Sequence, residues 1–148
     1  MWPPDLAPDG PPSILVGVDG STTSERAVWY AAGLARRQRA TLTAVYVVRP
    51  AVGLGAGSPT AVALSPQAKA ELADEIGRET EELVRELGVP TAFVAAFGDP
   101  FTEVCRVAEE VRADAVVVGA SARALHRLLG SLAVRLVKAG RWPVTVVP

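Results

Sequence analysis

The sequence is short of the residues on which several kinds of protein chemistry depend. Among its 148 residues there is one cysteine, Cys105, and one histidine, His126. A single cysteine excludes an intramolecular disulfide framework. We interpret Cys105, which lies in a run of helical period, as a buried apolar residue rather than a reactive thiol. No carboxylate or thiol lies at ligand spacing from His126, so we expect no metal site, and Ser-His-Asp catalysis is excluded unless His126 itself serves.

The sequence also lacks an excess of charge and any long apolar run. Its net charge of -1 creates no field that would attract DNA, RNA or anionic lipid, so we expect no nucleic-acid partner and no membrane partner. No segment reaches the roughly 18 apolar residues of a membrane span. Residues 1–12 (MWPPDLAPDGPP) lack the basic and apolar regions of a signal peptide and predict a flexible tail, so we expect a cytoplasmic protein.

Short apolar runs alternate with longer segments of helical period, which is typical of βαβ units around a parallel sheet. We therefore predict one doubly wound α/β domain over residues 13–148, with helices that begin near residues 22, 66, 100 and 132. Residues 51–65, rich in Gly, Ala, Ser and Pro, predict a flexible loop. The predicted strands are residues 14–18, 42–48, 89–97, 115–118 and 143–147.

Two helix starts carry recognisable capping signals. Thr22 and Glu25 have the spacing of a capping box, and Ser65-Pro66 predicts an N-cap followed by proline at the first helical position. Gly88 predicts the end of the second helix.

Candidate site residues follow two of the predicted strands, because ligands of open parallel sheets bind beyond the carboxyl ends of the strands. The first strand ends at Asp19. The fourth ends at Gly119 and leads to Gly130-Ser131, where backbone N–H groups at a helix start would suit a phosphate.

The candidate site residues also have structural interpretations that involve no ligand. Asp19 could cap the following helix, which its local sequence favours, and Gly119 and Gly130 could serve turns or close packing. Arg123, Arg127 and Arg135 could meet phosphates, but arginines on amphipathic helices are usually solvated.

The better-known nucleotide and hydrolase signatures are absent. No Gly-x-Gly-x-x-Gly follows the first strand, no Gly-Lys-Ser/Thr is present, and there is no Gly-x-Ser-x-Gly elbow. The residue pattern taken alone therefore predicts a doubly wound domain with one anion-binding site, at the end of the fourth strand and the start of the last helix.

Five segments in register resemble the universal stress protein family over residues 13–148. They are ILVGVDGS at 14–21, GDP at 98–100, ADAVVVGA at 113–120, GS at 130–131 and PVTVV at 143–147. The resemblance implies an adenine nucleotide alpha hydrolase-like fold with sheet order 3-2-1-4-5. It also implies a homodimer in which the fifth strands of two subunits pair.

The resemblance implies ATP as a ligand, and the sequence leaves open whether magnesium accompanies it. Asp19 and Val47, on the second strand, would hold the adenosine, while Gly119, Gly130 and Ser131 would hold the ribose and phosphates. The family's ATP signature is Gly, two residues, Gly, nine residues and Gly-Ser/Thr. Here Ala122 replaces the second glycine, and only seven residues separate it from Gly130. A methyl group and a shorter loop should narrow the room for a triphosphate, and some members of the family bind no ATP.

The function predicted from these observations is that of a dimerising, stress-responsive binding module rather than an enzyme. Two alternatives stay open. One is an ATP-independent protein-interaction module, for which Trp2, Trp29 and Trp142 are the candidate anchors. The other is a weak ATP hydrolase. Its candidate acidic residues at strand ends are Asp19 and Asp99, and its candidate neutral base is His126.

Overall fold

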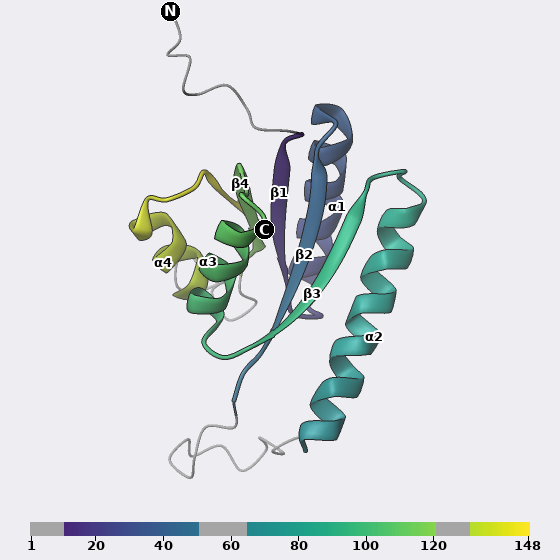
Figure 1. Cartoon of the computed structure of the whole chain (residues 1–148), viewed down its shortest axis with the longest axis vertical. Helices are drawn as coiled ribbons and strands as arrows, with labels where there is room; N and C mark the ends of the chain where they lie inside the picture. Colours follow the sequence, from purple (N-terminus) through teal and green to yellow (C-terminus); the bar gives the residue numbers. More distant parts are fainter. Residues whose placement is uncertain (1–10, 51–64, 121–130) are drawn as a thin grey trace, which may run out of the picture.

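The computed structural model describes residues 11–50, 65–120 and 131–148 (Figure 1). Most of the predicted tail (1–10) and of the predicted loop (51–64), together with residues 121–130, lies outside the described residues. The elements are β1 (Ser13–Val18), α1 (Thr22–Gln38), β2 (Thr41–Val48), α2 (Pro66–Arg85), β3 (Thr91–Phe97), α3 (Pro100–Glu110), β4 (Ala115–Gly119), α4 (Ser131–Ala139) and β5 (Val144–Val147).

The five strands form one parallel sheet in the order β3-β2-β1-β4-β5, which confirms the predicted fold class and strand order. β1 lies at the centre, where Ile14 pairs with Leu42 of β2 on one side and Ala115 of β4 on the other. Its residues are almost all buried, as expected for a strand that helices cover on both faces.

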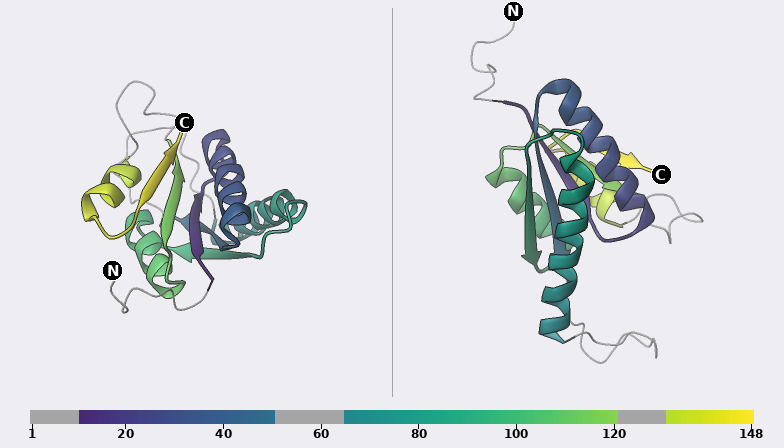
Figure 2. Two further views of the ribbon diagram at one scale, coloured as in Figure 1. Left: turned by 90° about the horizontal axis from the view of Figure 1, so that it is seen from above. Right: turned by 90° about the vertical axis from the view of Figure 1, so that its right-hand side faces the viewer.

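Helices cover both faces of the sheet: α1 and α2 lie on one, α3 and α4 on the other (Figures 1 and 2). Successive side chains of a strand point to opposite faces, so β1 contributes to two cores. Ile14 and Val16 pack with the alanines of α1, whereas Leu15 packs with Val104 of α3 and Leu136 of α4.

The first turns of α1 and α2 are capped by serine side chains. Ser65 Oγ accepts a hydrogen bond from the N–H of Ala68 at 3.2 Å, which confirms the predicted cap before Pro66. In α1 the cap is Ser21, whose Oγ accepts from the N–H of Ser24 at 3.2 Å. The predicted capping box at Thr22 was wrong by one residue, because Ser21 and Thr22 both have side chains suited to an N-cap.

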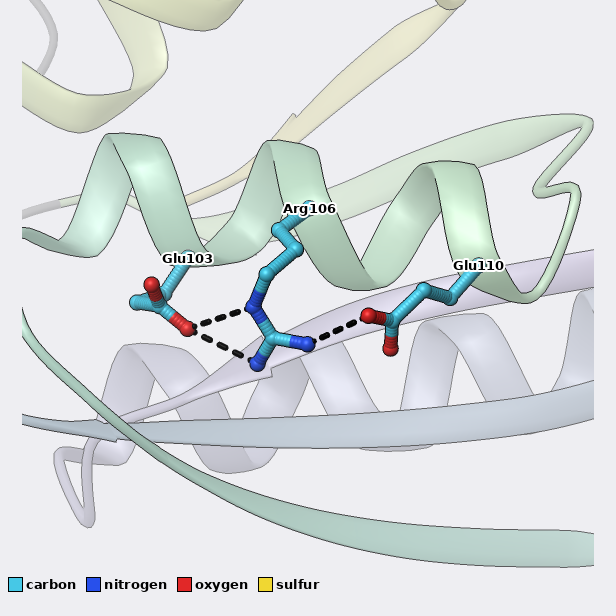
Figure 3. A network of polar contacts seen from close by, with 3 residues as sticks. All are labelled: Glu103, Arg106 and Glu110. Carbon is cyan, nitrogen blue, oxygen red and sulfur yellow. Dashed lines mark hydrogen bonds and ion pairs between the residues drawn. The ribbon is translucent and has the colours of Figure 1, made fainter.

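On the outer surface of α3, one arginine bridges two glutamates. Arg106 lies between Glu103 and Glu110, with contacts of 2.8 Å from Nη2 to Glu103 and 2.6 Å from Nη1 to Glu110 (Figure 3). These bonds raise the pKa of Arg106 above its ordinary value. The pairs have i,i+3 and i,i+4 spacing, and Arg106 and Glu110 are solvent-exposed, so each pair should stabilise α3 only slightly.

The end of β4 lies against the first turn of α1 with no room for a side chain. A Cβ atom built on Gly119 would be 2.6 Å from the carbonyl carbon of Thr23 and 2.8 Å from the backbone nitrogen of Ser24. Because these atoms belong to the backbone, they cannot move aside by a rotamer change. Gly119 is therefore a close-packing glycine, as one of the two sequence interpretations held.

We predict that Gly119→Ala destabilises the protein, because β4 and α1 must separate to admit the methyl group. The free energy of unfolding should fall by about 1–3 kcal/mol, measured by urea denaturation followed by circular dichroism. Gly33→Ala is the matched control. A Cβ there would meet only the guanidinium of Arg37, at 3.2 Å, and alanine favours a helix, so this change should be neutral or stabilising. Equal stability of Gly119→Ala and the unchanged chain would contradict the close contact.

Candidate functional site

A cavity of about 100 Å³ lies at the carboxyl ends of the central strands. It occupies the point where the chain winding reverses between β1 and β4, which is where open α/β sheets bind their ligands. The lining residues come from β1, β2 and β4, from the segments that follow β1 and β2, and from the helices. They are Gly17, Val18, Asp19, Ser24, Val45, Val47, Arg49, Pro100, Val104, Val118, Gly119 and Leu132.

Three of the five predicted site residues meet at this cavity. Asp19, Val47 and Gly119 line it from three different parts of the sheet. Ser131 is the first residue of α4, and its neighbour Leu132 also lines the cavity. Gly130 lies outside the described residues, as does Ala122.

Asp19 does not cap α1, so the interpretation that its local sequence favoured was wrong. Ser21 takes that role, and Asp19 Oδ1 instead accepts a hydrogen bond from the N–H of Ser21 at 2.9 Å. The N–H of Asp19 donates to Ser24 Oγ at 3.3 Å. Gly20 between them has a φ of +78°, a conformation that glycine adopts without strain. The carboxylate is thus oriented at the exposed edge of the cavity without being used to cap the helix.

The carboxylate of Asp19 also acts on a tyrosine of the neighbouring strand. Tyr46 pairs with Val18 in the sheet. Burial, and then the negative charge of Asp19, raise the pKa of the Tyr46 phenol above its ordinary value.

The cavity walls are mostly apolar, with few polar groups. Val45, Val47, Val104 and Leu132 contribute alkyl side chains, whereas the polar groups come from Asp19, Ser24 and Arg49. Small-molecule sites commonly combine apolar walls with a few polar groups that fix orientation.

Sequence reasoning missed part of this lining. Arg49 directly follows β2 at its carboxyl end, so the strand-end rule that identified Asp19 could also have identified Arg49. Ser24, Val104 and Leu132 lie on helices, and only the packing of those helices brings them to the cavity.

Asp99 is occupied by structural bonds. As the N-cap of α3 it accepts from the N–H of Thr102 at 3.0 Å, and its other oxygen pairs with Arg135 at 3.1 Å. The Arg135 guanidinium also lies 4.3 Å from the ring centre of Phe101. The bonds from Thr102, followed by that from Arg135, lower the pKa of Asp99, which makes it a poor general base. Asp99 is not among the cavity residues, and His126 lies outside the described residues.

Other candidate chemistry is sparse in the described part of the chain. Within residues 11–50, 65–120 and 131–148, no three His, Cys, Asp or Glu side chains cluster in a way that could hold a metal ion. Cys105 is buried, as predicted, and burial raises the pKa of its thiol. None of the helices in those ranges is long and apolar enough to cross a membrane.

Comparison with known proteins agrees with this architecture. The sequence model of the Universal stress protein family matches residues 12–148. A universal stress protein of Methanocaldococcus jannaschii is 34% identical over 142 residues, which cover 90% of this chain and 80% of that protein. The structure of universal stress protein UspA from Lactobacillus plantarum superimposes with a TM-score of 0.78 at 27% identity, covering 93% of this chain and 98% of that one.

A universal stress protein solved in complex with cAMP gives a TM-score of 0.70 at 26% identity, covering 93% of this chain and 97% of that one. Together with the strand order and the match over residues 12–148, these likenesses confirm the resemblance drawn from the sequence. The chain belongs to the universal stress protein family.

Proposed function

We propose that the chain binds an adenine nucleotide in the cavity at the carboxyl ends of β1, β2 and β4, and that it acts as a homodimeric binding module. The observation that carries the proposal is the convergence of Asp19, Val47 and Gly119 on one apolar cavity. The relative that was solved in complex with cAMP supports the choice of an adenine nucleotide.

The size of the cavity suggests how such a ligand would lie. About 100 Å³ is well below the roughly 300–1,000 Å³ of a site that encloses a whole small molecule. The cavity would therefore take the flat base between the side chains of Val47 and Val104. The Asp19 carboxylate, at the exposed edge, would accept hydrogen bonds from a ribose hydroxyl or from the amine of the base.

The phosphate would lie toward the start of α4. Ser131 opens this nine-residue helix, where unpaired backbone N–H groups and the helix dipole favour an anion. Ala122 and the seven residues between it and Gly130 leave less room than the family's ATP signature. We therefore expect AMP or cAMP to bind at least as tightly as ATP, with magnesium entering only as the companion of a triphosphate.

We predict that isothermal titration of the purified protein detects AMP, cAMP or Mg-ATP, and that Asp19→Ala weakens the binding about 10- to 100-fold. This range corresponds to the roughly 1.5–3 kcal/mol of a hydrogen bond to a charged group. Asp74→Ala is the matched control, because Asp74 is an exposed acid on α2 outside the cavity. If the unchanged protein binds none of the three nucleotides, or if Asp19→Ala binds as well as it does, the nucleotide site is wrong. The ATP-independent module would then be the better description.

The dimer proposal rests on the free edge of the sheet. β5 ends the strand order, and its four residues are half-buried. The carbonyl of Pro143 accepts a hydrogen bond from Val116 of β4, and that of Val147 accepts one from Ala120 just after β4. The alternate residues Val144 and Val146 therefore point their backbone groups outward. An unpaired edge of this kind favours pairing with another strand.

Exposed apolar side chains flank this edge on both faces of the sheet. On α1, Arg26 donates to the carbonyl of Pro148 just beyond β5, and Tyr30, one turn further and 43% exposed, lies on the same side of the helix. On α4, Arg135 faces α3, so Val137, two residues on, points away from α3. Val137 is 54% exposed. A second copy of the chain would cover both side chains while its β5 pairs with this one.

We predict that the protein is a dimer by light scattering coupled to size exclusion, and that Val137→Glu shifts it toward monomer by placing a charge in the apolar contact. Phe97→Glu is the matched control, because Phe97 is 67% exposed but lies on β3 at the opposite edge of the sheet. A monomeric protein, or equal effects of the two substitutions, would contradict pairing through β5.

A further inference from the structure

A second hollow, larger than the cavity at the strand ends, lies between α1 and α2. These helices lie side by side on one face of the sheet (Figure 2). The groove between them has a volume of about 440 Å³. The apolar side chains that line it are those of Val18, Val28, Ile76 and Leu83, with Thr80 among them, and the first three are themselves buried. Of the residues proposed to bind the nucleotide, none of those that the structure describes lines this groove.

Four glutamates line the groove, and none of them takes part in an ion pair within the described part of the chain. Glu25 comes from α1, Glu79 and Glu82 come from α2, and Glu86 directly follows α2. All four are exposed. Among the described residues, none of the ion pairs engages any of these glutamates, and no Lys or Arg lines the groove.

An exposed tryptophan completes the groove. Trp29 is 42% exposed and lines it one turn after Glu25 on α1. Trp142, by contrast, packs against the core under α3 and α4, with the Arg141 guanidinium 4.7 Å from its ring centre. Trp2 lies outside the described residues. Of the three tryptophans considered as partner anchors, Trp29 is thus the one placed on an open surface of the described chain.

We propose that this groove docks a lysine- or arginine-bearing amphipathic helix from a partner protein. Two adjacent helices with an apolar floor form the kind of groove into which an amphipathic helix lays its apolar face. The occupant would be cationic, because its positive side chains would pair with the four glutamates, none of which forms an ion pair within residues 11–50, 65–120 and 131–148. Trp29 would anchor it, since an indole combines a large apolar area with a face that attracts cations.

The stretch that lines the groove on this side, from Ser21, the N-cap of α1, to Trp29, spans about 12 Å at 1.5 Å per residue. This length corresponds to roughly two turns of a bound helix. The docked segment would therefore be short, which is typical of a transient contact rather than an obligate one.

The test uses a fluorescein-labelled peptide of roughly 16–18 residues built from Leu, Ala and Lys, long enough to form a helix. Its control is the same peptide with every Lys replaced by Glu. Each is titrated with the full chain, free of nucleotide, while fluorescence anisotropy is recorded. We expect the basic peptide to bind, the acidic one not to bind, and binding to weaken with added salt.

Matched variants distinguish peptide binding in the groove from nonspecific attraction of the peptide to any acidic surface of the protein. Glu79→Gln with Glu82→Gln should weaken binding about 3- to 10-fold, since each exposed pair contributes modestly. Glu75→Gln with Glu81→Gln removes the same charge from the same helix outside the groove and should change the affinity less than about 2-fold. Trp29→Ala should weaken binding at least about 10-fold.

A readout at the tryptophan makes the test independent of the charge variants. In an NMR titration of isotope-labelled protein, the indole N–H signal of Trp29, assigned from Trp29→Phe, should shift with the basic peptide. The proposal is overturned if the basic peptide does not bind, or if the two glutamine pairs weaken it equally. It is also overturned if the Trp29 signal stays in place while the peptide binds.

Discussion

The arrangement of the strand ends depends on the contact between the end of β4 and the first turn of α1. Gly119 allows the two backbones to meet, and a Cβ atom there would lie 2.6 Å from the Thr23 carbonyl carbon. The same turn is held by Ser21, which caps α1, and by Ser24, which accepts from the Asp19 N–H. One glycine therefore both allows the close packing and forms part of the cavity wall, so its structural role would not compete with the ligand-binding role proposed for it.

The first turn of α1 also separates the two hollows of the molecule. Val18 and Ser24 line both the cavity at the strand ends and the groove between α1 and α2. The free edge of β5 lies elsewhere, flanked by Tyr30 and Val137. A nucleotide, a partner helix and a second subunit would thus occupy three different surfaces. This separation is what a binding module needs if it is to engage several partners at once.

The strands and their order could be predicted because a strand covered on both faces must be continuously apolar, and because the strand motifs follow the order of a known family. The N-cap of α1 was misplaced because Ser21 and Thr22 have equally suitable side chains, and only the bond from Ser24 distinguishes them. The local sequence favoured Asp19 as the helix cap over a ligand-binding role, but the turn through Gly20 directs its carboxylate to the Ser21 N–H. The groove at Trp29 could not be predicted, since Glu25 and Glu82 meet only when α1 packs beside α2.

The nucleotide site is tested most directly by a crystal structure of the chain grown with cAMP. We expect density for the base in the cavity between Val47 and Val104. A carboxylate oxygen of Asp19 should lie within about 2.6–3.2 Å of a ribose hydroxyl or the amine of the base. A nucleotide bound elsewhere, such as in the groove between α1 and α2, would contradict the proposed site, as would crystals in which the cavity stays without a nucleotide.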